Sequence, residues 1–221
     1  MDDPWAQENK QEASASETLT FFEKIINVLF HPKDFFEWLS KNHSTKEAAK
    51  FFLLCNYLVY GILFLISVIG IIVLKSFITK LLPAILVSLG VIILIGIFLI
   101  FTIIFPLLSL LSLFVGASIS HVIILIFGGR DYSKTFSVGI YSLTPAFIAA
   151  LFLPIPLIGI IIIILASIWS SILGFYGIMK VHEFSFWKTL LLYLIPVCIM
   201  GLLIIAAIFF SGGLKDILPI R

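Results

Sequence analysis

Long apolar stretches alternate with short charged clusters along most of the chain. The first stretch, residues 51–74, carries no charged side chain over 24 positions. At about 1.5 Å per residue, such a helix would be about 36 Å long, enough to cross a hydrocarbon core of roughly 30 Å. Ser44 followed by Glu47 is typical of a helix start. We therefore expect this helix to begin near Thr45, before it enters the bilayer.

The second apolar stretch is too long for one simple crossing. Residues 81–129 are uncharged over 49 positions, about twice the length that one crossing requires. Pro106 lies near the middle, and proline removes a backbone donor and biases the preceding residue away from helix. This stretch should turn, kink or protrude. Residues 81–127 can be counted either as one long membrane element or as two spans.

The remaining apolar residues predict three further spans. Residues 135–179 are uncharged, and the Pro-Ile-Pro sequence at 154–156 interrupts them. This pattern predicts a hairpin of two spans, at about 136–153 and 157–179. Residues 190–210 supply the last span. The fold class expected from these patterns is all-α: a polytopic helical membrane bundle with five, or alternatively six, transmembrane elements.

Two short amphipathic helices are predicted before the first span. Residues 20–30 and 33–39 place apolar and aromatic side chains at helical spacing beside charged ones, and Thr20 with Glu23 can cap the first of them. Beside a bilayer, such helices can lie at headgroup depth or pack on the membrane domain, and the sequence leaves both arrangements open. The side chains expected at the membrane interface are Phe22, Phe35 and Trp38.

These patterns divide the chain into four segments. Residues 1–18 form a polar head that is expected to be disordered. Residues 19–43 hold the amphipathic helices. Residues 44–211 form the transmembrane domain, and residues 212–221 form a short tail.

Composition agrees with a membrane protein and narrows the function classes. Hydrophobic residues make up 61% of the chain and charged residues 12%, whereas a soluble domain carries roughly a quarter of its residues as charged ones. Nine of the twelve acidic residues lie in residues 1–50. A carboxylate-based active site and a nucleic-acid-binding surface are therefore disfavoured beyond residue 50.

Lys and Arg in the short loops indicate the orientation of the spans. With five membrane elements, eight of these cations lie on the amino-terminal side and four on the other, whereas with six elements the score is six against six. Five elements with a cytoplasmic amino end are therefore preferred. The eight cations are Lys33, Lys41, Lys46, Lys50, Arg130, Lys134, Lys180 and Lys188.

Few residues in the membrane could carry chemistry. The predicted spans contain no Asp, Glu, Lys or Arg, which disfavours ion-coupled transport. His121 is expected to hydrogen-bond a neighbouring helix rather than to bind a metal. Gly128 and Gly129 precede Arg130 without the Lys-Ser or Lys-Thr of a phosphate loop, so they predict a turn. We expect no enzyme activity, no catalytic residue, no cofactor and no metal site.

Small residues recur every four positions in the fourth predicted span. Ala166, Ser170 and Gly174 would lie on one helix face, where small side chains let two helices approach closely. Such a row can pack inside the bundle or form a seam between two copies, and internal packing is the preferred interpretation.

A set of polar, glycine, proline and aromatic positions extends over three successive spans: His121, Gly128, Gly129, Tyr141, Pro145 and Trp169. With these residues the chain resembles the Yip-domain family, the Ypt/Rab-interacting multipass membrane proteins, and its prokaryotic-type members in particular. The resemblance covers about residues 20–210. It implies five spans with a cytoplasmic amino end, in agreement with the distribution of Lys and Arg.

The resemblance also implies a class of function. We expect a non-enzymatic membrane protein that organises the bilayer and other membrane proteins, or copies of itself, without binding nucleic acid. A small GTPase would be a partner only in a eukaryotic host, where relatives act in endoplasmic reticulum and Golgi trafficking. A prokaryotic host would place the protein in the plasma membrane. The alternative is a permease or channel for a neutral or lipid-like solute, with helices broken at Pro106, Pro145 and Pro196 lining a path.

Overall fold

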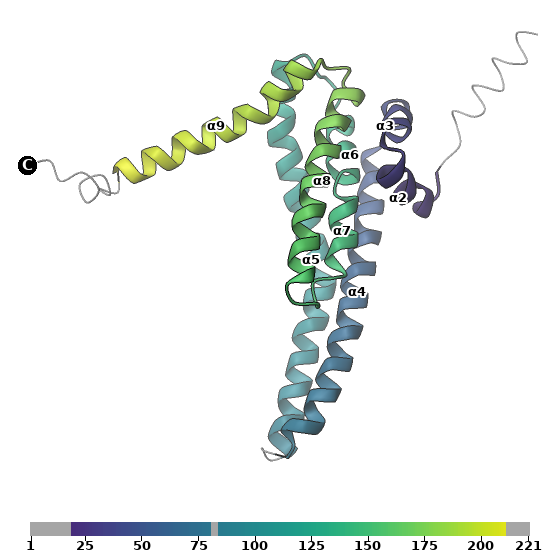
Figure 1. Ribbon diagram of the computed structural model, residues 1–221, viewed down its shortest axis with the longest axis vertical. Coiled ribbons are helices and arrows are strands. Elements are labelled where there is room, and N and C mark those ends of the chain that lie inside the picture. Colours follow the sequence, from purple (N-terminus) through teal and green to yellow (C-terminus); the bar gives the residue numbers. More distant parts are fainter. Residues whose placement is uncertain (1–18, 81–83, 211–221) are drawn as a thin grey trace, which may run out of the picture.

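The computed structural model describes residues 19–80 and 84–210 (Figure 1). The described residues form helices joined by turns and contain no strand, which confirms the expected all-α class. The predicted disordered head, residues 1–18, and the tail, residues 212–221, lie outside the described residues. The helices are α2 (Phe21–Phe30), α3 (Pro32–Lys41), α4 (Thr45–Ile78), α5 (Ala84–Ile126), α6 (Tyr132–Tyr141), α7 (Thr144–Ala150), α8 (Ile158–Val181) and α9 (Phe186–Phe210).

Both predicted helix starts at the amino end are confirmed. The backbone N–H of Glu23 donates to the hydroxyl of Thr20 at 3.4 Å, and the Glu23 carboxylate accepts from the backbone N–H of Thr20 at 2.7 Å. At the start of α4, the hydroxyl of Ser44 accepts from the backbone N–H of Glu47 at 3.4 Å. These bonds satisfy backbone donors that a helix start otherwise leaves unpaired.

The long second apolar stretch forms one helix, α5, that continues through Pro106. The chain therefore does not reverse within this stretch, and the alternative of two spans does not describe it. Its 43 residues correspond to a length of about 64 Å. Helices α4 and α5 form a hairpin that extends well beyond the other helices (Figure 1). Of the expected outcomes for this stretch, a turn, a kink or a protrusion, the structure shows the protrusion.

The span predicted at 136–153 is not one helix. It is divided into α6, of 10 residues, and α7, of 7 residues, and neither is long enough to cross a membrane. Ser142 and Leu143 lie between them, and Pro145 stands in the first turn of α7, where its missing N–H leaves no bond unmade. Four described helices, α4, α5, α8 and α9, are long and apolar enough to span a membrane. Four long helices and one broken pair therefore stand where five spans were predicted.

Helix α3 packs on the membrane domain. Phe35 is only 1% exposed, and its ring meets that of Tyr141 edge to face, with the centroids 5.1 Å apart. Phe35 therefore does not face the membrane interface, where the sequence placed it. Phe22 on α2 is 68% exposed, so α2 presents an aromatic side chain to the surroundings of the protein.

Three turns of the chain meet at one end of the bundle, which we call the polar end (Figure 1). His43, before α4, pairs with Asp131, before α6, with 2.5 Å between Nε2 and Oδ2. Thr135 on α6 lies 3.2 Å, Oγ1 to Nε2, from His182 at the end of α8. From this end α9 leaves the bundle at an angle, and its far end lies away from the other helices (Figure 1).

Candidate functional site

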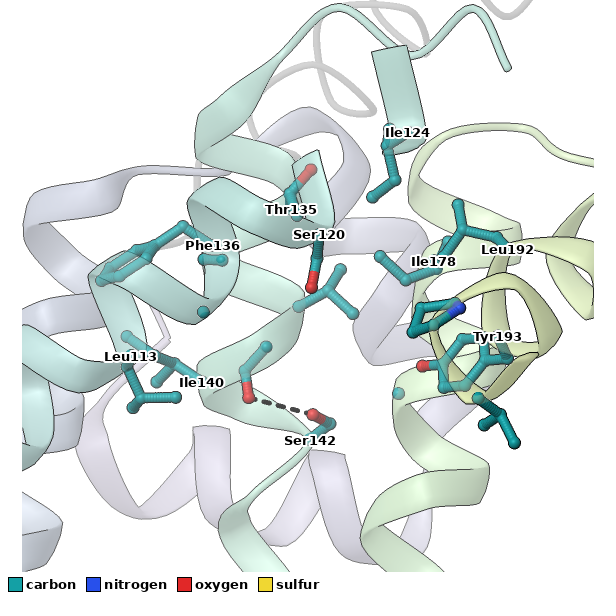
Figure 2. Close-up of a pocket in the computed structure, with 17 residues that line it drawn as sticks. Leu113, Ser120, Ile124, Thr135, Phe136, Ile140, Ser142, Ile178, Leu192 and Tyr193 are labelled. Carbon is teal, nitrogen blue, oxygen red and sulfur yellow. Dashed lines mark hydrogen bonds between the residues drawn. The ribbon is translucent and has the colours of Figure 1, made fainter. Parts of the chain in front are cut away.

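A cleft of about 440 Å³ lies between α5, α6, α8 and α9 (Figure 2). Its walls are mainly apolar, with Leu113 of α5, Ile140 of α6, Ile178 of α8 and Leu192 of α9 among them. Few polar groups reach it, and they are hydroxyls rather than charges. The residues that carry these hydroxyls are Ser120, Thr135, Ser142 and Tyr193.

Two glycines on the walls of this cleft face open space. A β-carbon built at Gly116 of α5 or at Gly139 of α6 would have no atom within 4 Å outside its own helix neighbourhood. Gly174 of α8 differs, because a β-carbon there would lie 2.9 Å from the hydroxyl of Tyr193. The cleft therefore exists because α5 and α6 lack side chains that would fill it, and Tyr193 limits it on the side of α8.

A chain of hydrogen bonds joins two histidines at the polar end, next to the cleft. The Nδ1 atom of His121 lies 2.8 Å from the hydroxyl of Thr135, which lies 3.2 Å from Nε2 of His182. A threonine hydroxyl can donate to one imidazole and accept from the other. His121 thus bonds a neighbouring helix, as its position in the sequence predicts.

His182 was not predicted as a member of this site. Burial, with smaller contributions from Lys134 and His121, lowers the pKa of His182 to about 4, so its ring is neutral at pH 7. One feature of the sequence could have indicated His182. The residue follows an apolar span whose end should lie on the same side of the membrane as His121. The spacing of 121 and 182 alone does not reveal that Thr135 joins them.

Asp131 holds the start of α6. Its Oδ1 atom accepts from the backbone N–H of Ser133 at 2.9 Å, and its Oδ2 atom pairs with His43. Burial raises the pKa of Asp131, but His43 and backbone N–H groups of α6 outweigh that effect and leave it below its usual value. The carboxylate is therefore charged at neutral pH and links α6 to the turn before α4. Among the described residues, no group of three or more His, Cys, Asp or Glu side chains could hold a metal ion.

Gly128 and Gly129 form the predicted turn at the end of α5. Gly128 has a φ of 96°, a conformation that glycine adopts without steric cost. The backbone N–H groups of both residues donate back to the last turn of α5, at 3.1 Å and 3.0 Å. A β-carbon at Gly129 would collide with Ile124 and lie 3.1 Å from Nδ1 of His182. Glycine at 129 thus lets the α5–α6 turn approach the α8–α9 turn.

The other motif residues lie apart from this cleft. Tyr141 is buried between Phe35 and Phe51, with 4.8 Å between the centroids of its ring and that of Phe51. Pro145 and Trp169 both line a shallow groove between α2, α7 and α8. The structure therefore brings His121 and the two glycines to the polar end and divides the other three between the core and this groove.

The row of small residues on α8 packs within the chain. Gly174 approaches Tyr193 of α9, and Ala166 lines the groove beside α7. Ser170 is buried, and its hydroxyl has no hydrogen-bond partner in the described part of the chain. Gly177 was not predicted as a packing residue, yet a β-carbon there would lie 2.7 Å from both Phe36 of α3 and Val138 of α6.

Comparison with known proteins identifies the family. The model of the Yip1 domain matches residues 26–208, which include the cleft and the polar end. No curated protein and no solved structure matches the chain. The match and the four long apolar helices together make this an integral, multipass membrane protein. Because the family model covers most of its length, the chain belongs to the Yip1 domain family.

Proposed function

We propose that the protein is a non-enzymatic membrane organiser that gathers other membrane proteins, or copies of itself, through lateral contacts of its helices. The observation that carries this proposal is the exposed apolar surface of its longest helices. In α4, α5 and α9, only 6% of the most apolar 18-residue window is buried within the chain. A partner helix can replace lipid on such a face, because both are equally apolar and packing then decides the association.

The proposed topology has five membrane elements and a cytoplasmic amino end, with α6 and α7 together as the third element. Nine Lys and Arg residues of the described chain lie in the helices and turns near the polar end, including Lys24, which pairs with Glu47 at the start of α4, whereas Lys75 and Lys80 lie at the tip of the α4–α5 hairpin. An excess of cations on one side is typical of the cytoplasmic face.

Helix α2 is proposed to contact the membrane interface. Phe22 and Phe30 are 68% and 72% exposed, and Ile26 between them is also exposed. These three residues follow one another at a spacing of four, so they share one face of the helix. Trp38 is half-buried on α3 and therefore contributes less of its ring than Phe22 does.

Photo-crosslinking in native membranes tests the proposed organising role. A photoreactive residue replaces Ile204, which is 55% exposed on α9, and a matched control replaces Leu173, which is 1% exposed on α8. We expect discrete protein adducts from position 204 and none from position 173. Adducts with lipid alone at position 204, and at further exposed positions on α4 and α5, would contradict the proposal.

The cleft favours a second candidate, a permease for a neutral or lipid-like solute. It has an apolar wall with a few hydroxyls, as such a solute requires. Helices α5 and α9 run through Pro106 and Pro196 unbroken, so only the break beside Pro145 remains from the path first expected. Flux of an uncharged solute into proteoliposomes that is lost when Gly116→Leu or Gly139→Leu fills the cleft would favour this candidate. Equal leakage from protein-free vesicles would eliminate it.

A further inference from the structure

We propose that the cleft between α5, α6, α8 and α9 binds one acyl chain of an anionic phospholipid, whose phosphate lies near Lys134 and Lys188 at the polar end. This inference depends on the membrane placement of these helices and not on the proposed organising role. It gives the cleft an occupant of defined chemistry.

The cleft is unfilled. Some helical glycines in this chain allow close approach, as at Gly177, where Phe36 packs on the helix backbone, whereas others, such as Gly61 and Gly96, face open space away from the cleft. At Gly116 and Gly139 nothing approaches, and the space remains open. Walls that face a void lose dispersion contacts, so an apolar occupant stabilises the folded chain. Water is a poor occupant because it needs two to four polar partners, and most of this wall is apolar.

The walls of the cleft belong mainly to helices that are expected to face lipid. Three of the four walls, α5, α8 and α9, are helices long and apolar enough to span a membrane. Tyr193, Pro196 and Val197 of α9 border the cleft, and α9 then diverges from the bundle (Figures 1 and 2). The cleft therefore opens towards the region that acyl chains occupy. A flexible chain can enter it sideways without leaving the hydrocarbon.

The polar end of the cleft carries an excess of positive charge. Lys188 lies four residues before Leu192, a wall residue of α9, so both lie on the same helix face. Lys134 adjoins Thr135, another wall residue. The segments 128–134 and 180–188, which meet at the polar end, hold four cations against two acids, and one of these acids, Asp131, is paired with His43. The excess of positive charge complements a phosphate beside the cleft.

Photolabelling in proteoliposomes tests the acyl-chain site. The probe is phosphatidylglycerol with a diazirine midway along one chain, and mass spectrometry locates the label. We expect label on the cleft walls of α5, α6 and α8, reduced about tenfold or more when Gly116→Leu or Gly139→Leu fills the cleft. Gly96→Leu is the matched control, because Gly96 also lies on α5 and also faces open space, but away from the cleft.

A second comparison tests the headgroup. The same diazirine on phosphatidylcholine should label the cleft about fivefold less than phosphatidylglycerol, and Lys188→Gln should abolish this preference. Circular dichroism and elution volume in detergent establish that each variant is folded, and the two glycine positions provide independent variants.

Three results would overturn the proposal. The first is equal labelling of the cleft in Gly116→Leu, Gly139→Leu and Gly96→Leu. The second is equal labelling by the two phospholipids, and the third is a cleft protected from both probes by α9 of a second copy, detected as an interchain crosslink. Protein adducts from position 204 are a separate measurement, so failure here is distinguishable from failure of the organising role.

Discussion

The ring of Phe36 lies against Gly177 so closely that a β-carbon at the glycine would be 2.7 Å from Cε1 of the ring. Cγ1 of Val138 on α6 would lie at the same distance from that β-carbon. One residue without a side chain thus joins α3, α6 and α8, and α3 is a packed part of the membrane domain.

Replacement of Gly177 by alanine should destabilise the protein. The added methyl group forces Phe36 or Val138 to move, and such overpacking costs about 1–3 kcal/mol. Gly61→Ala on α4 is the control, because a β-carbon there meets nothing within 4 Å. Thermal unfolding in detergent measures both variants. If Gly177→Ala unfolds at the same temperature as Gly61→Ala, the close contact does not hold α3 in place.

Loss of the hydroxyl at Thr135 should also weaken the polar end. Thr135→Val keeps the shape of the side chain but leaves nitrogens of His121 and His182 without their partner. A buried polar group without a partner costs about 1–3 kcal/mol. Thr135→Ser retains the hydroxyl and should recover most of the stability in the same unfolding measurement. Unchanged stability in Thr135→Val, with a loss only in Thr135→Ser, would mean that the methyl group, not the hydrogen bond, matters.

Stability should depend on pH through His182. Its pKa falls from 6.5 to about 4 on folding, so the unfolded chain binds the proton more readily between these values. The stability that neutral His182 contributes is complete above pH 6.5 and is lost as the pH falls towards 4. Because the ring is partly exposed, we expect a loss of about 1 kcal/mol. In His182→Gln, the unfolding free energy should fall by about 1 kcal/mol less between pH 6.5 and pH 4 than in the parent protein. Identical pH profiles of the two proteins would refute this assignment.

Two substitutions separate the roles of Asp131. Asp131→Asn can still cap α6 but loses the charge that pairs with His43, and we expect a loss of about 0.5 kcal/mol. Asp131→Ala loses the cap as well, and we expect a loss of about 1–2 kcal/mol. Chemical or thermal unfolding of the two variants in parallel gives the difference. An equal loss in both would assign the whole effect to the ion pair.

Local signals in the sequence predicted much of the fold. The starts of α2 and α4 follow from Thr20 and Ser44, because a cap acts within three residues and needs no distant partner. The turn before α8 follows from the prolines at 154 and 156 for the same reason. Apolar length predicted the four long helices, although not the continuity of α5 through Pro106.

Features that depend on distant residues were not predicted. The break between α6 and α7 at Ser142 was not predicted either, although the hydroxyl of this residue bonds locally to the carbonyl of Gly139, because an apolar pattern does not distinguish this break from a continuous span. His182 and Gly177 gain their roles from side chains on other helices. The cleft depends on what is missing at Gly116 and Gly139, and only the packed helices reveal that absence.

The length of the α4–α5 hairpin sets a condition on the membrane that holds it. The 41-residue span within α5 is about 62 Å long, and a tilt of 40°, near the upper limit for membrane helices, still leaves it far longer than a hydrocarbon core of roughly 30 Å. Tilt alone therefore does not resolve the mismatch. The bilayer must thicken around the hairpin or leave part of it uncovered, at a cost that falls as the surrounding membrane becomes thicker. The stability of the hairpin is therefore expected to depend on bilayer thickness.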